Sequence, residues 1–344
     1  MIKVLGLEQS DEWDGIVRSF TEYDTYWLSG YVKAFFLHGD GIPLMVYCEN
    51  GDARGINVVM KRSLPPMPDN EEGFHTDEWF DFSTPYGYGG WLIEGETSEG
   101  LFTEYEKWCL NNNIISEFVR FHPVIDNQRY SAGSYEVVHL GNTVTIDTSS
   151  PEVIWENITS KGRNTIRKAQ KNGIKIYNGR SRELYRIFKE IYDGTMDKDH
   201  AEEYYYFSDE FYESILEDLS TNAQVFYAEY EGKIIAASIM LAVNGRMNYH
   251  LSGSLREYAN LAPSNLLLYQ ASLWGCANGC KTLYLGGGVG SSEDSLYTFK
   301  KAFNRQDNDR IFCIGKKIFN KDVYDRLAEL HGNTDSSFFP IYRA

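Results

Sequence analysis

The chain has 344 residues with a formal net charge of -16 at pH 7; 42% of the residues are hydrophobic and 24% are charged. This length suits two packed domains, and the composition excludes a disordered or fibrous protein. The negative charge argues against a general binder of duplex DNA, because duplex affinity depends on many lysine and arginine contacts to phosphate.

The sequence has no run of about 18 apolar residues, which a membrane-spanning helix needs, and its N-terminal residues lack the pattern of a secretory signal. We therefore expect a cytoplasmic protein without a transmembrane segment. Its five cysteines form no CxxC pair, and no Cys/His spacing is typical of zinc. The sequence thus predicts no metal site and reduced cysteines that serve in packing.

Hydrophobic periodicity predicts alternating strands and helices from the first residues onward. In the first half we expect helices at 11–20 and 98–111 and strands at 43–48, 55–60 and 117–121. In the second half we expect helices at 151–171, 181–194, 208–219, 263–278 and 292–302, and strands at 143–147, 224–230, 234–243, 246–252 and 281–285. Mixed strands alternating with helices predict an α/β fold with mixed sheets.

Two connections add detail to this fold. The pair Glu231-Gly232 separates two apolar runs and is typical of a tight hairpin turn. A last helix at 321–330 is followed by FFPIYR, whose apolar residues we expect to pack back on the body of the protein.

A glycine-rich segment, TLYLGGGVGSSEDSLYTFKKAF, occupies residues 282–303. It lacks the third glycine of a dinucleotide fingerprint and the Gly-Lys-Ser/Thr of a P-loop. Glu293 and Asp294 in the first turn of the expected helix would repel a phosphate. The pattern therefore indicates a flexible turn that lets backbone approach another group, followed by a helix that presents Tyr297, Phe299, Lys300 and Lys301.

On that helix, Leu296, Phe299 and Phe303 form an apolar stripe, with Lys300 one position off it. The spacing is compatible with an ordinary amphipathic helix whose lysines are solvated. It is equally compatible with a lysine fixed near a cleft, where an ammonium group stabilises developing negative charge as oxyanion donors do.

A basic segment, KGRNTIRKAQKNGIK at 161–175, carries six basic and no acidic side chains. Trp155, Ile158, Gly162, Ile166 and Ala169 predict the inner stripe of a helix, and Arg163, Arg167 and Lys171 recur every four residues on another face. One interpretation is a solvated face. The other is an anion site, because like charges at this spacing repel each other unless an anion such as phosphate lies among them.

These motifs occur in the order TSKGRNTIRKAQKNGIKI, NYHLSGS, APSNLLLYQASLWGCANG, LYLGGG and LYTFKKAF, preceded by PYGYGGW at 85–91 and EFVRFHP at 117–123. The order resembles the Fem-type (FemAB-like) peptidyltransferases and the BioF2-like acetyltransferases, which belong to the GNAT superfamily. The resemblance covers most of the chain. It implies two tandem GNAT-like domains with a substrate cleft between them.

We therefore expect an acceptor-side domain at 1–143, a second domain with the FK motif at 144–318, and a tail at 319–344 that packs on the first domain. The resemblance implies catalytic roles for Phe299 and Lys300 at the reacting carbonyl. It also implies phosphate binding by Arg163, Arg167 and Lys168, to which the helical spacing adds Lys171. Further substrate contacts are expected from Tyr86, Tyr88, Arg120 and Tyr297.

Three departures limit what the resemblance implies. The coiled-coil insertion of some Fem enzymes is absent, which weakens the case for a tRNA-borne donor. The acetyltransferase pyrophosphate signature is missing before the helix at 263–278, which puts acetyl-CoA in doubt. Where many Fem enzymes have Asp-Pro, this chain has His122-Pro123, and His122 either serves as a base or merely ends a strand.

The sequence leads to the hypothesis of an N-acyltransferase that transfers an acyl or aminoacyl group to an amine of a cell-envelope glycan or peptidoglycan precursor. The acceptor would be a nucleotide-linked or lipid-linked amino sugar or peptide. The donor would be acyl-CoA or aminoacyl-tRNA, with no tightly bound cofactor. The alternative is a catalytically inactive module of the same fold that binds a phosphate-bearing sugar or nucleotide.

Overall fold

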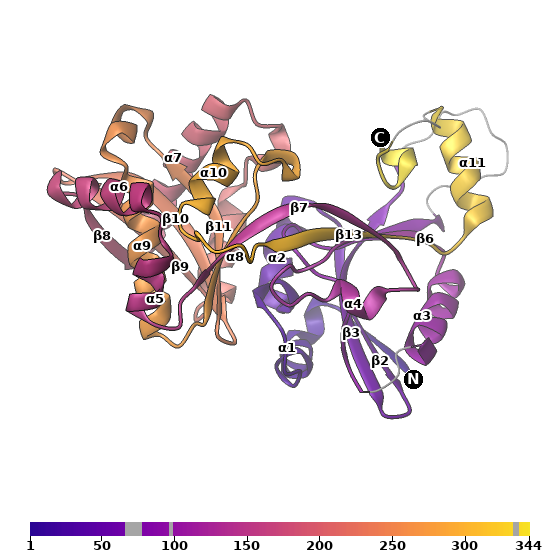
Figure 1. Ribbon diagram of the computed structural model, residues 1–344. Coiled ribbons are helices and arrows are strands. Elements are labelled where there is room, and N and C mark those ends of the chain that lie inside the picture. Colours follow the sequence, from indigo (N-terminus) through magenta and orange to yellow (C-terminus); the bar gives the residue numbers. More distant parts are fainter. Residues whose placement is uncertain (66–77, 96–98, 333–336) are drawn as a thin grey trace. The chain divides into compact units, whose positions relative to one another are not determined.

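The computed structural model describes residues 1–65, 78–95, 99–332 and 337–344. The chain divides into two compact units, Met1–Leu140 with Phe312–Ala344, and Gly141–Ile311 (Figure 1). The predicted second domain, 144–318, therefore runs past the end of the second unit. The reason is that Ile314–Ile318 pair with a strand of the first unit.

The first unit is a mixed sheet with helices on it. Its strands lie in the order β1-β2-β3-β4-β6-β13, with β5 paired to β3. Among the strand pairs that the structure describes here, only β4 and β6 run parallel. The strands are β1 (Ile2–Leu5), β2 (Ile42–Asn50), β3 (Ala53–Ser63), β4 (Phe80–Ser83), β5 (Leu92–Glu94), β6 (Ile114–Arg120) and β13 (Arg310–Ile318). The helices are α1 (Ser10–Arg18), α2 (Ser29–His38), α3 (Glu99–Asn111), α4 (Gln128–Ser131) and α11 (Lys321–His331).

The last residues of the chain are bonded into the first unit. The buried Tyr342 hydroxyl lies 2.9 Å from the Ser116 hydroxyl and donates to Asp81 at 3.1 Å. Arg343 forms an ion pair with the same Asp81 carboxylate. Tyr342 and Leu327 of α11 form a small apolar cluster with Ile115 of β6.

The second unit is also a mixed sheet, in the order β7-β12-β11-β10-β9-β8, in which only β11 and β12 run parallel. Its strands are β7 (Glu136–Asp147), β8 (Lys175–Gly179), β9 (Ala223–Tyr230), β10 (Lys233–Val243), β11 (Arg246–Ser254) and β12 (Thr282–Gly286). Its helices are α5 (Pro151–Asn157), α6 (Ser160–Lys171), α7 (Arg182–Asp199), α8 (Asp209–Asp218), α9 (Pro263–Ala277) and α10 (Ser295–Lys301). The predicted hairpin is confirmed, because Glu231 and Gly232 both have positive φ angles, 49° and 79°, between β9 and β10.

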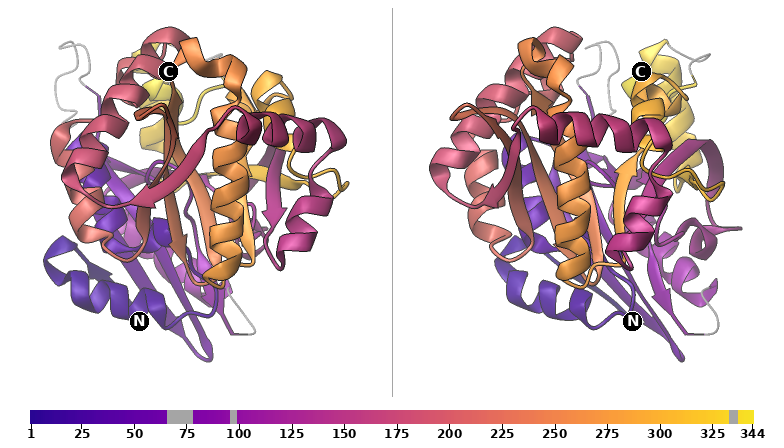
Figure 2. Two further views of the ribbon diagram at one scale, coloured as in Figure 1. Left: turned by 90° about the vertical axis from the view of Figure 1, so that its left-hand side faces the viewer. Right: turned by 60° about the vertical axis from the view of Figure 1, so that its left-hand side comes forward.

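One apolar core joins the helices of this unit to the sheet. In Figure 2 the orange α9 lies along the strands and the magenta α6 crosses it. Ile166 and Ala169 of α6, Leu267 of α9 and Phe226 of β9 are all buried in this core. Helix α7 packs on β10 and β11.

The predicted single helix at 151–171 is wrong, because the chain breaks between α5 and α6. Ile158 and Thr159 are extended, with ψ angles of 134° and 156°. The Thr159 hydroxyl accepts a hydrogen bond from Gly162 N at 3.1 Å, which starts α6 as an N-cap. Thr159 N in turn donates to the carbonyl of Ala302 at 2.9 Å, so the break also anchors the segment that follows α10.

Candidate functional site

Helix α10 is shorter than predicted and buries a different face. The helix spans Ser295–Lys301, with Asp294 as its N-cap, and its buried residues are Tyr297 and Lys300. Leu296, which was expected in an inner apolar stripe, is 38% exposed, and Phe299 is only partly buried against the core. Lys300 is therefore not a solvated lysine but the inward-facing residue of a two-turn helix.

The Lys300 amine has one partner in the backbone. Its side chain is 8% exposed, and Nζ donates to the carbonyl oxygen of Gly287 at 2.7 Å. Burial lowers the pKa of Lys300 from 10.5 to about 8, and the nearby Asp294 carboxylate acts in the opposite direction. The amine is thus mainly protonated at neutral pH, with N–H groups beyond the one that Gly287 accepts.

The glycine segment explains how the lysine is held. Gly286, at the end of β12, has a φ angle of 80°, and a Cβ there would lie 3.4 Å from Lys300 Nζ. A Cβ on Gly287 would lie 2.9 Å from the carbonyl of Asn142. The glycines therefore let the backbone approach Lys300 and β7. The expectation of a close backbone approach is confirmed, and the group approached is the lysine amine.

The two parallel strands next to this loop separate. β12 pairs with β11 only at Arg246–Asn248 against Thr282–Tyr284, whereas β11 continues to Ser254. The loop that holds Lys300 begins where β12 ends, at Gly286. The part of β11 after Asn248 is therefore not paired with β12. An extended ligand with amide groups can form backbone hydrogen bonds with such an unpaired strand edge.

The other two predicted residues of α10 have packing and hydrogen-bonding roles. The Phe299 ring packs edge-on against Phe303, with centroids 5.9 Å apart. The Tyr297 hydroxyl donates to Asp309, and both burial and this carboxylate raise the pKa of Tyr297. Lys301 Nζ lies 2.7 Å from the other oxygen of Asp309, so this aspartate ties the following loop to the helix.

The basic segment forms α6 and the start of β8. Its six cations, within the described part of the chain, form no ion pair with a carboxylate: Lys161, Arg163, Arg167, Lys168, Lys171 and Lys175. Arg167, Lys168 and Lys171 are exposed. An acidic protein that leaves these cations without carboxylates offers an attractive surface for an anion.

The basic side chains of α6 do not share one role. Arg163 donates to the carbonyls of Trp155, Glu156 and Ile158, at 3.3, 3.4 and 2.6 Å, and so caps the end of α5. The Arg167 guanidinium lies over the Trp155 ring, 5.1 Å from its centroid. Lys168 and Lys171 are the predicted phosphate ligands for which the described residues provide no hydrogen-bond or ion-pair partner.

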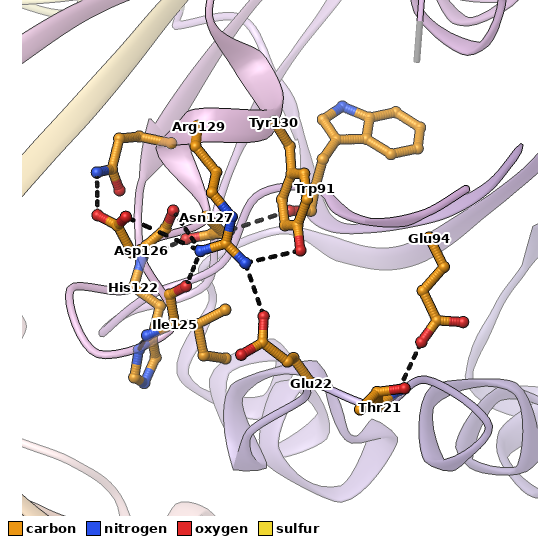
Figure 3. A network of polar contacts seen from close by, with 11 residues as sticks. Thr21, Glu22, Trp91, Glu94, His122, Ile125, Asp126, Asn127, Arg129 and Tyr130 are labelled. Carbon is orange, nitrogen blue, oxygen red and sulfur yellow. Dashed lines mark hydrogen bonds and ion pairs between the residues drawn. The ribbon is translucent and has the colours of Figure 1, made fainter. Parts of the chain in front are cut away.

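His122 lies in the interior of the first unit, after β6. It is fully buried, with Nε2 3.2 Å from Asp24 Oδ2, and Nδ1 accepts from the backbone N–H groups of Val124 and Ile125 at 3.2 Å. Its backbone N–H donates to Asn127, whose amide reaches the carbonyl of Trp91 at 3.2 Å (Figure 3). The sequence left two roles open for His122, a catalytic base or a residue that ends a strand. Because both ring nitrogens face protein groups, the geometry favours the second, structural role.

The other three predicted residues of the first unit lie on or next to the PYGYGGW loop, and one of them, Tyr88, contacts His122. The Tyr88 ring packs edge-on to the His122 ring, with centroids 5.4 Å apart. Arg120 Nε donates to the carbonyl of Gly87 at 2.9 Å, and its guanidinium lies 4.9 Å from the centroid of Phe312. Tyr86 stacks on Phe35 at 5.5 Å. These residues form an aromatic cluster that holds the PYGYGGW loop.

Two groups that hold Lys300 are not among the predicted site residues: Asp294 and the carbonyl of Gly287. The signal for Asp294 was present, since aspartate followed by Ser-Leu-Tyr is a good N-cap. It was interpreted only as a charge that repels phosphate. Among the described residues, no group of three or more His, Cys, Asp or Glu side chains is arranged to hold a metal ion.

The comparisons with known proteins agree with this geometry. Residues 160–301 match the family model described as Acetyltransferase (GNAT) domain. This match identifies an acyltransferase domain of the GNAT type within the second unit. In such enzymes acyl-CoA is a substrate rather than a tightly bound cofactor. The GNAT match ends at Lys301, so it includes the glycine loop and Lys300.

Solved structures extend the likeness to nearly the whole chain. FemX has a TM-score of 0.69 at 12% identity and covers 95% of this chain and 99% of its own. L-PGS from Bacillus licheniformis has a TM-score of 0.57 at 14% identity, with coverages of 89% and 91%. A tandem GNAT protein from the clavulanic acid biosynthesis pathway has a TM-score of 0.50 at 8% identity, with coverages of 93% and 99%.

At these identities the structures share the fold, and the predicted fold class of two tandem GNAT-like domains is confirmed. No curated protein matches the chain. In the ranges that the structure describes, no helix is both long enough and apolar enough to cross a membrane.

Proposed function

We propose that this GNAT acyltransferase transfers an acyl or aminoacyl group to an amine of a cell-envelope glycan or peptidoglycan precursor in the cytoplasm. One observation carries the chemical part of the proposal. The Lys300 amine is buried, has a pKa of about 8 and is fixed by the carbonyl of Gly287 beside the end of β12. A cation held in this way is suited to stabilise an oxyanion, because it needs no rearrangement when the charge develops.

In the proposed reaction the neutral amine of the acceptor attacks the donor carbonyl. A C–N bond forms, and the carbonyl oxygen becomes an oxyanion that accepts a hydrogen bond from the Lys300 ammonium. The oxyanion then collapses, and the bond to the leaving group breaks, which is C–S for a thioester of coenzyme A or C–O for an aminoacyl ester of tRNA. The amine loses its proton, and the leaving group or solvent takes it. His122 has no part in these steps.

The edge of β11 supports an extended donor. Beyond Asn248 it has no register with β12, and it lies in the same unit as Lys300. The pantetheine arm of coenzyme A and an aminoacyl ester both place polar groups on a narrow chain, which such an edge can bind through its backbone. The sequence LREYANLAPSN before α9 lacks the pyrophosphate signature, so both donors belong in the test.

The exposed face of α6 supports a phosphate-bearing substrate. Lys168 and Lys171 are exposed and have no acidic partner in the described residues. Arg163 also lacks an acidic partner there, but its guanidinium is bound to the carbonyls at the end of α5. The N-terminal end of α6 is joined to the C-terminal end of α10 through Thr159 N and the carbonyl of Ala302. The choice of a nucleotide-linked or lipid-linked amine as acceptor rests on the Fem-type resemblance, which the FemX-like fold supports.

The first experiment identifies the substrates by thermal shift. The purified protein is screened with acetyl-CoA, longer acyl-CoAs, charged and uncharged tRNA, and nucleotide-linked amino sugars and peptides. A ligand that binds only the folded state raises the midpoint by mass action. A shift from a donor together with a shift from an amine-bearing acceptor supports the proposal. A shift from a phosphorylated sugar alone, with no response to any donor, contradicts it.

The second experiment measures turnover of the donor and acceptor found in this way. Lys300→Met should lower turnover by ~100-fold or more, as the loss of an oxyanion donor does. Lys301→Met is the matched control, because its ammonium is paired with Asp309 outside the Gly287 loop. Unchanged turnover in a folded Lys300→Met variant would remove the proposed role of Lys300.

A further inference from the structure

The Asp294 carboxylate joins two elements that surround Lys300. One oxygen accepts from the backbone N–H of Tyr297 at 2.9 Å, in the first turn of α10. The other oxygen accepts from the backbone N–H of Val289 at 3.1 Å, in the glycine loop. These backbone hydrogen bonds lower the pKa of Asp294, so the group is ionised at neutral pH.

The loop fits closely around this carboxylate. A Cβ on Gly288 would lie 2.3 Å from Asp294 Oδ1 and 2.1 Å from the carbonyl oxygen of Ser292, so only glycine fits there. Gly288 links Val289, which Asp294 binds, to Gly287, whose carbonyl accepts from Lys300. Asp294 thus fixes the backbone at Val289, two residues after Gly287, whose carbonyl accepts from the lysine amine.

Three other charged groups near this helix, Glu293, Lys301 and Asp309, have partners of their own. Glu293 accepts from the Asn142 side chain at 2.9 Å. Lys301 is paired with Asp309, which also accepts from the Tyr297 hydroxyl. The glycine loop at 286–291 carries no charged side chain. Asp294 is therefore the carboxylate that favours the protonated form of Lys300 against the effect of burial.

We infer that Asp294 is the positioning residue of Lys300: it clamps the glycine loop to the start of α10 and so sets the place and the charge of the lysine amine. The inference rests on the proposed function in so far as Lys300 acts on the donor carbonyl. The clamp itself concerns only the free enzyme, so it can be tested without any substrate.

The test measures the protonation of Lys300 directly. The protein is exposed briefly to acetic anhydride at a series of pH values, and mass spectrometry of the peptide that contains Lys300 gives the midpoint of its reactivity. In the wild type we expect a midpoint near pH 8. In Asp294→Asn the midpoint should fall by ~0.5 unit or more, because a nearby opposite charge is lost.

Glu293→Gln is the matched control, because it removes the same charge from the adjacent residue, which does not bind the loop. Its midpoint should stay at the wild-type value, and Asp294→Glu should move the midpoint back toward that value. If Asp294→Asn does not fold, Asp294→Ser keeps an N-cap without the charge and replaces it in the comparison. An unchanged midpoint in a folded Asn or Ser variant overturns the inference.

Turnover separates this inference from the proposed function. If Lys300 is an oxyanion donor, the alkaline limb of the pH–rate profile of Asp294→Asn should shift to lower pH, by the same amount as the labelling midpoint. If Lys300→Met keeps full turnover, the proposed role of Lys300 fails. The labelling result would still show whether Asp294 sets the protonation of the amine.

Discussion

Replacing Lys300 by methionine should raise the free energy of unfolding of the second unit at neutral pH. Burial lowers the pKa of Lys300 from 10.5 to about 8, a drop of roughly 2.5 units. Each unit corresponds to about 1.4 kcal/mol, so the charged amine costs the folded state about 3.5 kcal/mol. Loss of the hydrogen bond to Gly287 destabilises the variant by about 1 kcal/mol, which leaves a net gain in the free energy of unfolding of about 2.5 kcal/mol.

The gain should depend on pH in a defined direction. The folded pKa lies below the unfolded one, so the folded wild type releases its proton first as the pH rises. The wild type therefore becomes relatively more stable between about pH 8 and 10.5, and the advantage of Lys300→Met should shrink over that window. Below pH 8 the advantage should be complete and constant.

Urea unfolding at pH 7, 9 and 10, followed by tryptophan fluorescence, gives the free energies for the wild type and both variants. Lys301→Met is again the control, because its ammonium is partly exposed and paired with Asp309. This control should show no gain at any pH. A Lys300→Met protein that is less stable than the wild type at pH 7, or whose gain does not change with pH, would refute the reasoning.

Three further predictions follow from the packing of single side chains. Arg163→Ala should lower the free energy of unfolding by about 1–3 kcal/mol in urea, because three carbonyls at the end of α5 lose their donor. The double variant Lys168→Ala and Lys171→Ala should change stability by less than about 0.5 kcal/mol but abolish the thermal shift caused by a phosphate-bearing ligand; a retained shift would exclude the α6 surface. Glu117→Ala should lower the free energy of unfolding by about 3 kcal/mol or more, because this fully buried carboxylate accepts hydrogen bonds from Asn57, Tyr105 and Tyr135. A decrease below about 1 kcal/mol would contradict that account.

The fold class could be predicted because hydrophobic runs and turn residues agree along most of the chain. The hairpin at Glu231-Gly232 and the long apolar strand β10 are examples. The break between α5 and α6 could not be predicted from periodicity, because Ile158 fits the inner stripe on either side of it. What breaks the helix is the Thr159 cap and the carbonyl of Ala302, which comes from a distant part of the sequence.

The candidate site could be predicted only in part, because the sequence identified Lys300 but neither its burial nor its hydrogen-bond acceptor. Lys300 stood out through the resemblance and its place after the glycines, but its burial could not be derived from the stripe of Leu296 and Phe299. A two-turn helix has too few residues for periodicity to decide which face is inside. The acceptor for the lysine amine is a backbone carbonyl, which has no signature in the sequence.

The first unit is made of two separate segments, Met1–Leu140 and Phe312–Ala344, whereas the second is continuous from Gly141 to Ile311. This has a consequence for synthesis on the ribosome. The second unit is complete as soon as its last residue has left the exit tunnel. The first unit, although it begins earlier, still lacks β13, α11 and the Tyr342 contact to Ser116 at that time. Its sheet keeps β6 as an uncovered edge until β13 has left the tunnel, so nascent chains stalled before that point should be more prone to aggregation than chains in which β13 has paired with β6.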